Sequence, residues 1–250
     1  MKRLLLFFSL VLITTVTANA QNKTFKVNGI SFSMVKVKGG TFTMGATGEQ
    51  IGDADDGEMP AHKVTLSNYY IGQTEVTQAL WQAVMGYNPS YFSDNNQRPV
   101  DHVNWDDCQE FISKLNSLTG EHFRLPTEAE WEFAARGGNK NKGYKYSGHD
   151  VPGRVAWFLA NIRGTSVVGQ KDPNELGIYD MSGNVWEWCT DWFGNYSSAS
   201  QTNPQGPSTG TYRVVRGGSW LNAADCLRVS KRGGDYPNCG TYSNGFRLAL

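Results

Sequence analysis

The chain has 250 residues, of which 39% are hydrophobic, 12% aromatic and 18% charged. Lysine plus arginine and aspartate plus glutamate both total 23, so the formal net charge of zero gives no reason to expect a nucleic-acid partner or an anionic lipid surface. A chain of this length can bury most of its apolar surface in one large domain, and its 28 glycines and 8 tryptophans indicate irregular backbone held by large aromatic side chains.

The first twenty residues have the order typical of a secretory signal peptide. Lys2-Arg3 precede an almost unbroken apolar run over residues 4–13, and the small-residue segment Ala18-Asn19-Ala20 follows. The run is too short to cross a bilayer, and no other stretch is apolar enough to do so. We therefore expect cleavage near Ala20, a mature domain of residues 21–250, no membrane span, and a location in the periplasm, at the cell surface or outside the cell.

Two short alternating segments near the start of the mature domain predict strands. Residues 33–37 and 41–44 are rich in β-branched residues, and Lys38-Gly39-Gly40 supplies a turn, so we expect a hairpin. Residues 63–66 and 69–72 predict two further short strands. A helix is expected to begin at Thr77.

The clearest predicted helix covers residues 105–118. Asn104 is a favourable N-cap, apolar residues recur at helical spacing, and Gly120 supplies a stop signal.

A further helix is predicted to open with a capping box formed by Thr127 and Glu130. Capping accounts for Glu130. We interpret the neighbouring Glu128 and Glu132 as part of a solvated face and not as a catalytic pair of carboxylates.

The four cysteines and four histidines do not form a zinc pattern. In an exported chain, cysteines favour disulfides over zinc ligands. Neither residue type shows the spacing of a metal-hydrolase motif. These residues are Cys108, Cys189, Cys226 and Cys239, and His62, His102, His122 and His149.

The segment Gly177–Trp188 (GIYDMSGNVWEW) is the densest group of candidate site residues. It combines Asp180 and Glu187 with glycines and two tryptophans, and it fits the period of neither a strand nor a helix. Glycine allows turns that bring oxygens to one point, and oxygen ligands suit a hard cation such as Ca²⁺. From the residues alone, the segment is either a cation-binding loop or a glycine-rich turn between two core aromatics.

Gly177–Trp188 resembles the G-[LI]-x-[DN]-[ML]-x-G-N-V-W-E-W segment of the formylglycine-generating enzyme family, also called the sulfatase-modifying factor family. Other blocks typical of that family occur in the same order, from about residue 30 onward. They are Val35–Gly45, Glu58–Val64, Thr74–Thr77, Pro99–Trp105, Arg124–Ala135, Arg216–Trp220 and Gly245–Leu248. The resemblance implies an α+β fold with little regular secondary structure, a variant of the C-type lectin fold.

The resemblance also implies calcium sites. It assigns side-chain ligands to Asp180 and Glu187 and carbonyl ligands to Gly183 and Val185. A second calcium site in the family begins at an Asn-Ile pair, which Asn161-Ile162 matches here. The acidic loop that completes that second site has no counterpart, because residues 163–170 contain no acid.

The catalytic centre of the family is a pair of copper-binding cysteines in the pattern G-G-S-[YW]-x-C-x₄-C. Two thiolates suit the soft ion Cu(I). In this chain Gly217–Leu221 is followed by Asn222 at the first cysteine position, and Cys226 lies one residue before the second position. Because an amide cannot replace a thiolate for Cu(I), half of the copper site is missing.

Two functions remain open from the sequence. The first is a non-oxidase family member that binds a protein or glycan partner outside the cytoplasm. The second is a copper-dependent oxidase that converts a sulfatase cysteine to formylglycine, with Cys226 and another ligand at the metal. Residues 221–244 also resemble the variable patch of retroelement-diversified lectin-fold proteins. The family packs the regions of Cys189 and Cys226 together, so the resemblance further implies a disulfide bridge between them.

Overall fold

The computed structural model describes residues 22–250, so the expected signal peptide at residues 1–20 lies outside the described residues. The strands are β1 (Lys23–Val27), β2 (Ile30–Val37), β3 (Gly40–Met44), β4 (His62–Leu66), β5 (Tyr69–Gly72), β6 (Trp186–Trp192), β7 (Gln201–Thr202), β8 (Arg213–Arg216), β9 (Arg232–Asp235) and β10 (Asn244–Gly245). The α-helices are α1 (Gln78–Met85), α2 (Trp105–Thr119), α3 (Glu128–Ala135) and α4 (Pro152–Val155). Short 3₁₀ helices are η1 (Ile51–Asp53), η2 (Asp56–Glu58), η3 (Gly138–Lys140) and η4 (Ala224–Leu227).

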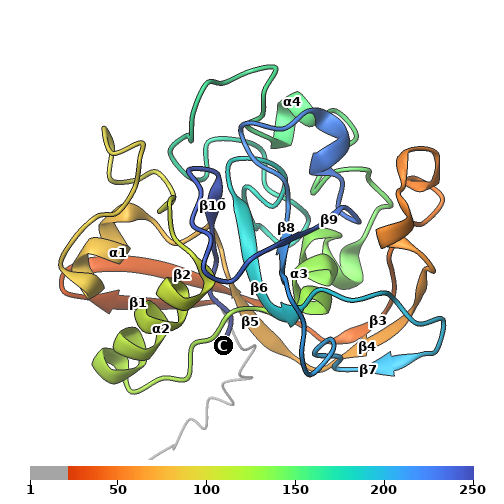
Figure 1. Ribbon diagram of the computed structural model, residues 1–250, viewed down its shortest axis with the longest axis horizontal. Helices are drawn as coiled ribbons and strands as arrows, with labels where there is room; N and C mark the ends of the chain where they lie inside the picture. Colours follow the sequence, from red (N-terminus) through yellow and green to blue (C-terminus); the bar gives the residue numbers. More distant parts are fainter. Residues whose placement is uncertain (1–21) are drawn as a thin grey trace, which may run out of the picture.

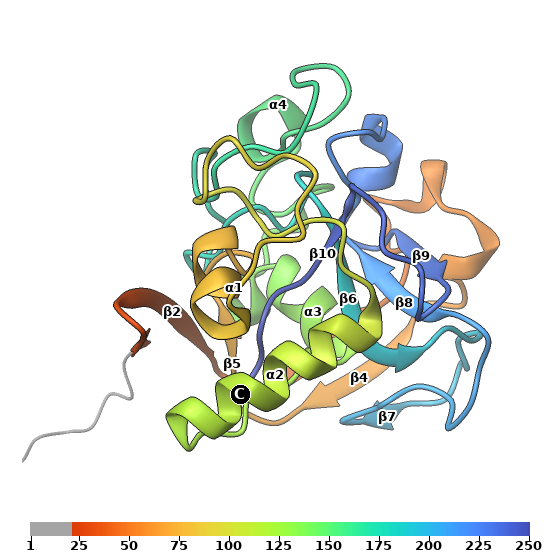
Figure 2. The ribbon, with the colours of Figure 1, turned by 60° about the vertical axis from the view of Figure 1, so that its left-hand side comes forward.

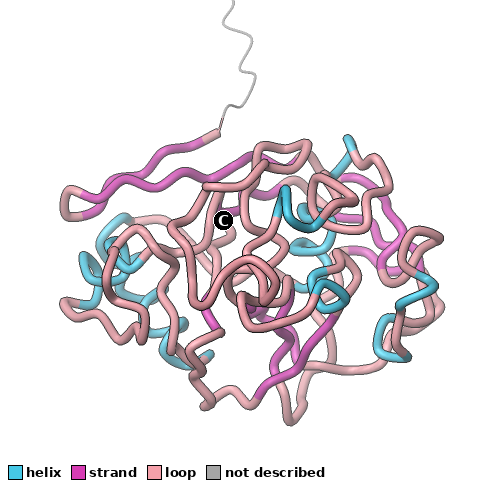
Figure 3. Tube along the Cα trace, turned by 90° about the horizontal axis from the view of Figure 1, so that it is seen from above, coloured by secondary structure: helices cyan, strands magenta, loops and turns pink. Residues whose placement is uncertain are grey.

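The strands form three small sheets with orders β1-β2-β5, β10-β6-β8-β9 and β3-β4-β7. In Figure 1 the first sheet lies with α1 and α2 at one end of the molecule, and β3, β4 and β7 lie at the other. The sheet built on β6 and β8 stands between them. Loops and turns make up much of the trace (Figure 3), which confirms the expected α+β class with little regular secondary structure.

The predicted hairpin near the N-terminus is wrong in its pairing. β2 and β3 both form, but β2 pairs with β1 and β5, whereas β3 pairs with β4. The short turn at Lys38-Gly39 therefore carries the chain from one sheet to another. The local glycine signal was correct for a turn and carried no information about which strand each segment would find.

The predicted helices are confirmed, and their caps explain their limits. The side chain of Asn104 accepts a hydrogen bond from Asp107 N, the Asp107 side chain accepts one from Asn104 N, and Gly120 ends α2 with a φ of 72°. One face of α2 is buried against α1, where the rings of Trp81 and Phe111 stack at 5.1 Å between centroids. These contacts form the core beside the first sheet.

Helix α3 differs most from its sequence-based interpretation. The capping box of Thr127 and Glu130 is present, but all eight helical residues are buried. Glu132 pairs with Arg216 at 2.6 Å and with Arg136 at 2.8 Å, and Glu128 pairs with Arg232 at 2.5 Å. The predicted solvated face is therefore wrong, because arginines from β8 and β9 compensate these glutamates in the core.

Residues 246–250 close the first sheet. Gly72 N donates to Leu248 O and Leu250 N donates to Tyr70 O, each at 2.8–2.9 Å. Figure 2 shows this last segment running from β10 to the side of β5. Phe246 packs there between α1 and α2, with its ring 5.4 Å from that of Phe111. The segment joins β6 to a sheet formed near the start of the described chain.

Within residues 22–250, no helix combines the length and hydrophobicity that crossing a membrane requires.

Candidate functional site

The loop that leads into β6 turns sharply through residues with positive φ. Asp180, Gly183 and Asn184 have φ values of 57°, 84° and 61°. A side chain at Gly183 would overlap the backbone of Trp157, whose carbonyl accepts a hydrogen bond from Asn184 N at 2.8 Å. The sequence interpretation is correct for residues 177–185, which are irregular, and wrong for the last three residues of the segment, which begin β6.

Glu187 is fully buried and its charge is compensated within the protein. Its carboxylate accepts hydrogen bonds from Arg247 Nε at 2.5 Å and Arg247 Nη2 at 2.6 Å. Trp131 Nε1 donates a third hydrogen bond to it at 2.7 Å. Arg247 itself also donates to the carbonyls of Gly72 and Tyr179. Glu187 thus connects the loop to α3 through Trp131 and to residues 246–250 through Arg247.

Asp180 and Glu75 lie in the same buried region, and neither forms an ion pair within residues 22–250. Arg247 lies near enough to lower both pKa values, but it pairs directly with Glu187. Asp180 Oδ2 accepts from Gly169 N at 2.6 Å, and Glu75 Oε1 accepts from Asn184 Nδ2 at 3.0 Å. The second oxygen of each carboxyl is buried and has no hydrogen-bond partner among the described residues. Burial raises the pKa of Asp180 to about 6, and burial together with the nearby Asp180 raises the pKa of Glu75 well above its usual value. Two such neighbouring carboxyls favour a proton on one of them or a bound cation.

The residues expected to hold calcium fit that ion unequally. Asp180 keeps a free oxygen directed into a buried region, which suits a hard cation, and Glu75 supplies a second free oxygen that the sequence did not single out. Gly183 and Val185 lie between Asp180 and Glu187 in the chain. Glu187 fits less well because its carboxylate is occupied by Arg247 and Trp131. Over residues 22–250, no group of three or more acidic, histidine or cysteine side chains is gathered as a metal site.

The Asn161-Ile162 pair is engaged in its own turn. Asn161 Oδ1 accepts from Phe158 N and its Nδ2 donates to Ala156 O, both at 2.9 Å. The side-chain amide of Asn161, which would begin the second calcium site, is therefore already occupied by hydrogen bonds within this turn.

The region matched to the copper centre contains no pair of thiols. Gly217 and Gly218 turn the chain with φ values of 92° and 70°. Asn222, at the first cysteine position, accepts hydrogen bonds from Ser219 N at 3.0 Å and Ser219 Oγ at 2.7 Å. Leu227 occupies the second position and is fully buried. The amide therefore closes a turn, and an apolar side chain takes the place of the other ligand.

Cys226 lies half-buried on η4, and burial followed by the charge of Asp225 raises the pKa of its thiol. The four cysteines are free, so the expected Cys189–Cys226 bridge is absent from the structure. Cys189 is fully buried in the core cluster around α3. Cys226 lies on the short helix η4 and is partly exposed. Strand β6 directs the Cys189 side chain into the core. The expected bridge took into account only that the segments of Cys189 and Cys226 lie near each other, and not the direction of this side chain.

Four aromatic side chains beside Asn222 form what we call the aromatic surface: Tyr91, Phe92, Trp220 and Tyr242. Each ring packs against the next in a row. The centroid distances are 5.0 Å for Tyr91–Phe92, 5.2 Å for Phe92–Trp220 and 5.9 Å for Trp220–Tyr242. Tyr91 is 69% exposed and Tyr242 is 44% exposed. A depression of about 520 Å³ adjoins Tyr91 and Phe92 and is edged by Arg98 and Arg163.

Comparison with known proteins places this geometry in a family. The family model of the sulfatase-modifying factor enzyme 1-like domain matches residues 19–250. The chain belongs to the formylglycine-generating enzyme family. Its α+β architecture is that family's variant of the C-type lectin fold.

Relatives in this family carry different names. Chaperone protein LppX of Paenibacillus barcinonensis is 32% identical, covering 93% of this chain and 93% of its own length. The formylglycine-generating enzyme of Streptomyces coelicolor is 30% identical, covering 86% of this chain and 88% of its own. The solved structure of Treponema denticola variable protein 1 is 34% identical with a TM-score of 0.83, covering 92% of this chain and 98% of its own. Membership in the family therefore does not determine oxidase activity.

The site residues that the sequence did not identify come from distant parts of the chain. Asn184 bonds to Glu75 across 109 residues, and Glu187 bonds to Arg247 across 60 residues. Both partners lie in the family blocks Thr74–Thr77 and Gly245–Leu248. Those blocks were signals for the fold, and their charged residues could have been examined as partners for Asp180 and Glu187.

Proposed function

We propose that this protein is a binding member of the formylglycine-generating enzyme family and that it does not oxidise cysteine. The observation that carries the proposal is the pair Asn222 and Leu227 at the positions of the two copper ligands. Copper(I) requires soft ligands, and neither a carboxamide nor an alkyl side chain supplies one. Cys226 offers a single thiol whose raised pKa disfavours the thiolate that binds metal.

The aromatic surface is the proposed binding region, and its partner is a protein segment outside the cytoplasm. Exposed tyrosines beside the buried Trp220 have the composition of interaction hot spots. Arg98 and Arg163 edge the adjoining depression. Arg98 pairs with Asp94 and Arg163 donates to backbone carbonyls through Nη1, and their remaining N–H groups can donate to backbone or acidic groups of a partner. The surface contains Tyr242, which lies in residues 221–244, and Trp220, which immediately precedes that segment. The segment resembles a variable patch, and the relative from Treponema denticola is named a variable protein.

The oxidase alternative has a direct test. The purified chain is incubated with Cu(I), O₂ and a peptide containing C-x-P-x-R, and the aldehyde product is measured by mass spectrometry. We expect no product above a control without protein. The matched variant Asn222→Cys/Leu227→Cys restores the family's cysteine spacing, and product formed only by this variant would support a scaffold that lacks the ligands. Turnover by the natural chain that Cys226→Ala abolishes would establish the oxidase instead.

The binding surface can be tested with selected peptides. A displayed peptide library is selected on the purified chain, and the affinities of the recovered peptides are measured against variants. Tyr91→Ala and Tyr242→Ala should each weaken binding by about tenfold or more, as expected for hot-spot residues. Tyr212→Ala is a matched control, because Tyr212 is 39% exposed and its ring packs on Tyr236 and on none of the four rings of the aromatic surface. Equal loss in the control, or no loss in the first two variants, would reject the assignment.

We also propose export and a calcium ion bound near Asp180. The basic, apolar and small-residue order of residues 1–20 supports removal of a signal peptide and a mature N-terminus at Gln21. Intact-mass measurement of protein recovered from outside the cytoplasm should give the mass of residues 21–250, and retention of residues 1–20 would contradict the proposal. Support for calcium comes from the free buried oxygens of Asp180 and Glu75.

A further inference from the structure

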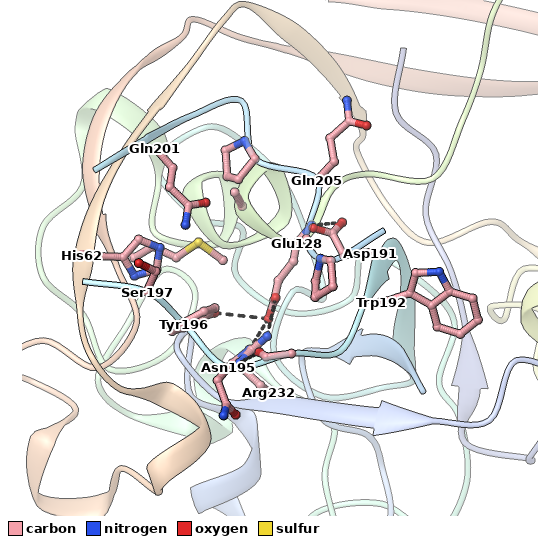
Figure 4. A pocket seen from close by; sticks show the side chains of 16 residues that line it. His62, Glu128, Asp191, Trp192, Asn195, Tyr196, Ser197, Gln201, Gln205 and Arg232 are labelled. Atoms are coloured by element: carbon pink, nitrogen blue, oxygen red, sulfur yellow. Dashed lines mark hydrogen bonds and ion pairs between the residues drawn. The ribbon is translucent and has the colours of Figure 1, made fainter. Parts of the chain in front are cut away.

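A second cavity lies away from the aromatic surface, between the start of α3 and the loop that follows β6. Its volume is about 330 Å³, at the lower end of the range of about 300–1,000 Å³ for small-molecule sites. Figure 4 shows His62 and Gln201 on one side of it, with Asp191 across from them and Glu128 and Tyr196 between. Trp192 is directed away from the other labelled side chains (Figure 4).

The two charges at the base of this cavity compensate each other. Arg232 donates to Glu128 through Nε at 2.5 Å and through Nη2 at 2.8 Å. Its remaining nitrogen, Nη1, donates to the carbonyls of Gly57 and Gly194, and its guanidinium lies 3.9 Å from the Tyr196 ring centroid. Because every nitrogen of Arg232 is already used, the cavity has no free cation to attract an anionic ligand.

Asp191 is the carboxyl of this cavity that has no ion-pair partner among the described residues. It is 96% buried, being only 4% exposed, and its Oδ2 accepts a hydrogen bond from Glu128 N at 2.9 Å. Its Oδ1 makes no hydrogen bond, and its carboxylate forms no salt bridge, within the part of the chain that the structure describes. Burial, with the neighbouring charge of Glu128, raises the pKa of Asp191 to about 7. The carboxyl can therefore donate or accept near neutral pH.

Neutral polar side chains also line the cavity, with His62 and Gln201 across from Asp191 (Figure 4). The half-buried side-chain amide of Gln201 makes no hydrogen bond to any residue in the range 22–250, and the exposed Asn195 and Gln205 lie at the rim of the cavity. His62 uses Nδ1 for the carbonyl of Pro60 at 3.1 Å, which leaves Nε2 available. Amides, an imidazole nitrogen and a carboxyl together offer both donors and acceptors. A ligand hydroxyl also donates and accepts, so these groups and hydroxyls are complementary.

We propose that this cavity binds an uncharged, hydroxyl-rich ligand of one or two rings, which is the chemistry of a neutral sugar unit. Because the charges of Glu128 and Arg232 compensate each other, this pair favours neither an anionic nor a cationic ligand. Asp191 and Gln201 are the residues that contact the hydroxyl groups. This site is separate from the aromatic surface and does not depend on the function proposed for that surface.

The experiment uses the purified chain and a set of simple probes. The neutral probes are the methyl glycosides of glucose, galactose, mannose and N-acetylglucosamine, the anionic probe is glucuronate, and the cationic probe is agmatine. Saturation-transfer NMR detects binding, and titration followed by ¹⁵N spectra of the side-chain amides locates it. We expect at least one neutral glycoside to bind in the millimolar range and to shift the Gln201 amide.

Two variants and one control test the contacts. Gln201→Ala removes one side-chain hydrogen-bonding group and should weaken binding roughly 2- to 10-fold. Asp191→Asn keeps an acceptor for Glu128 N while replacing the carboxyl, and its unfolding curve reports whether the fold is intact. Gln170→Ala is the control, because Gln170 is exposed and lies outside the cavity.

Each outcome decides the assignment. Binding of a neutral glycoside that Gln201→Ala weakens and Gln170→Ala leaves unchanged supports it. Binding of agmatine or glucuronate in preference to every neutral glycoside overturns the ligand class. Absence of binding by all four glycosides, or equal affinity in Gln201→Ala, overturns the site.

Discussion

At the scale of single residues, the buried acids of the β6 loop divide into two kinds. Glu187 is compensated by Arg247, so its ionised form is stable without an added ion. Asp180 and Glu75 each retain a buried oxygen without a partner among residues 22–250. Their pKa values are raised, so in the absence of a cation one or both hold a proton near neutral pH. Calcium should therefore act through Asp180 and Glu75 more than through Glu187.

We predict that calcium stabilises the natural chain and not Asp180→Asn. Extracellular sites bind calcium with a Kd of about 10⁻⁴–10⁻³ M, and at ten times Kd the ion would add about 1.4 kcal/mol to the free energy of unfolding. Unfolding by urea is compared in EGTA and in excess calcium. Asp172→Asn, at an exposed residue that pairs with Arg154, is the control and should keep the calcium response.

Glu187→Gln should behave differently from Asp180→Asn. It leaves Arg247 buried with reduced compensation, and breaking a buried ion pair from one side costs about 3–5 kcal/mol. The loss should appear both in EGTA and in calcium. An identical unfolding midpoint for the natural chain in the two solutions would contradict the calcium proposal.

At the scale of elements, helix α3 depends on ion pairs that reach it from other strands. We predict that Glu132→Gln lowers the free energy of unfolding by about 3–5 kcal/mol, because Arg136 and Arg216 both lose a buried carboxylate and Arg216 keeps only the longer contact of 3.6 Å with Glu128. Glu110→Gln is the matched control. Glu110 pairs with Lys114 on the exposed face of α2, and such a pair contributes about 0.3–0.5 kcal/mol. Similar losses from the two substitutions would show that α3 is held by its apolar contacts alone.

The elements also show where the sequence was sufficient. Helix α2 was predictable from its cap and apolar stripe and α3 from its capping box, because these are local signals within one or two turns of chain. The pairing of β2 and β3 was not, because each strand's partner lies outside the local turn. The same distinction applies to the site. The β6 loop was recognisable from Gly177–Trp188, but Glu75 and Arg247 are distant in sequence, and the unpaired amides of the second cavity have no motif.

At the scale of the whole molecule, buried acids should make stability depend on pH. Burial is the leading cause of the raised pKa values of Asp101, Asp180 and Asp191, which are about 6, 6 and 7. Between pH 4 and 7 the native state therefore holds these protons more tightly than the unfolded chain does. Stability contributed by these groups increases as pH falls through that window.

We predict a higher unfolding midpoint in urea at pH 5.5 than at pH 7.5, measured in EGTA so that calcium does not compete for Asp180. Groups with lowered pKa values, such as Glu58 and Glu128, oppose this trend only at lower pH, where they begin to be protonated. Asp191→Asn should reduce the difference between the two pH values. A midpoint that falls on acidification from pH 7.5 to 5.5 would contradict the prediction.

The closing of the first sheet by residues 246–250 has a consequence for synthesis. Arg247 bonds to Gly72 across 175 residues of chain. At a translation rate of about 5–20 residues per second, this interval corresponds to roughly 9–35 s during which β5 has no partner on that edge. During that time the core between α1 and α2 stays incomplete, because Phe246 has not yet been synthesised. Late completion of the core is compatible with the proposed export, because a chain that passes through a translocation channel must do so before it folds.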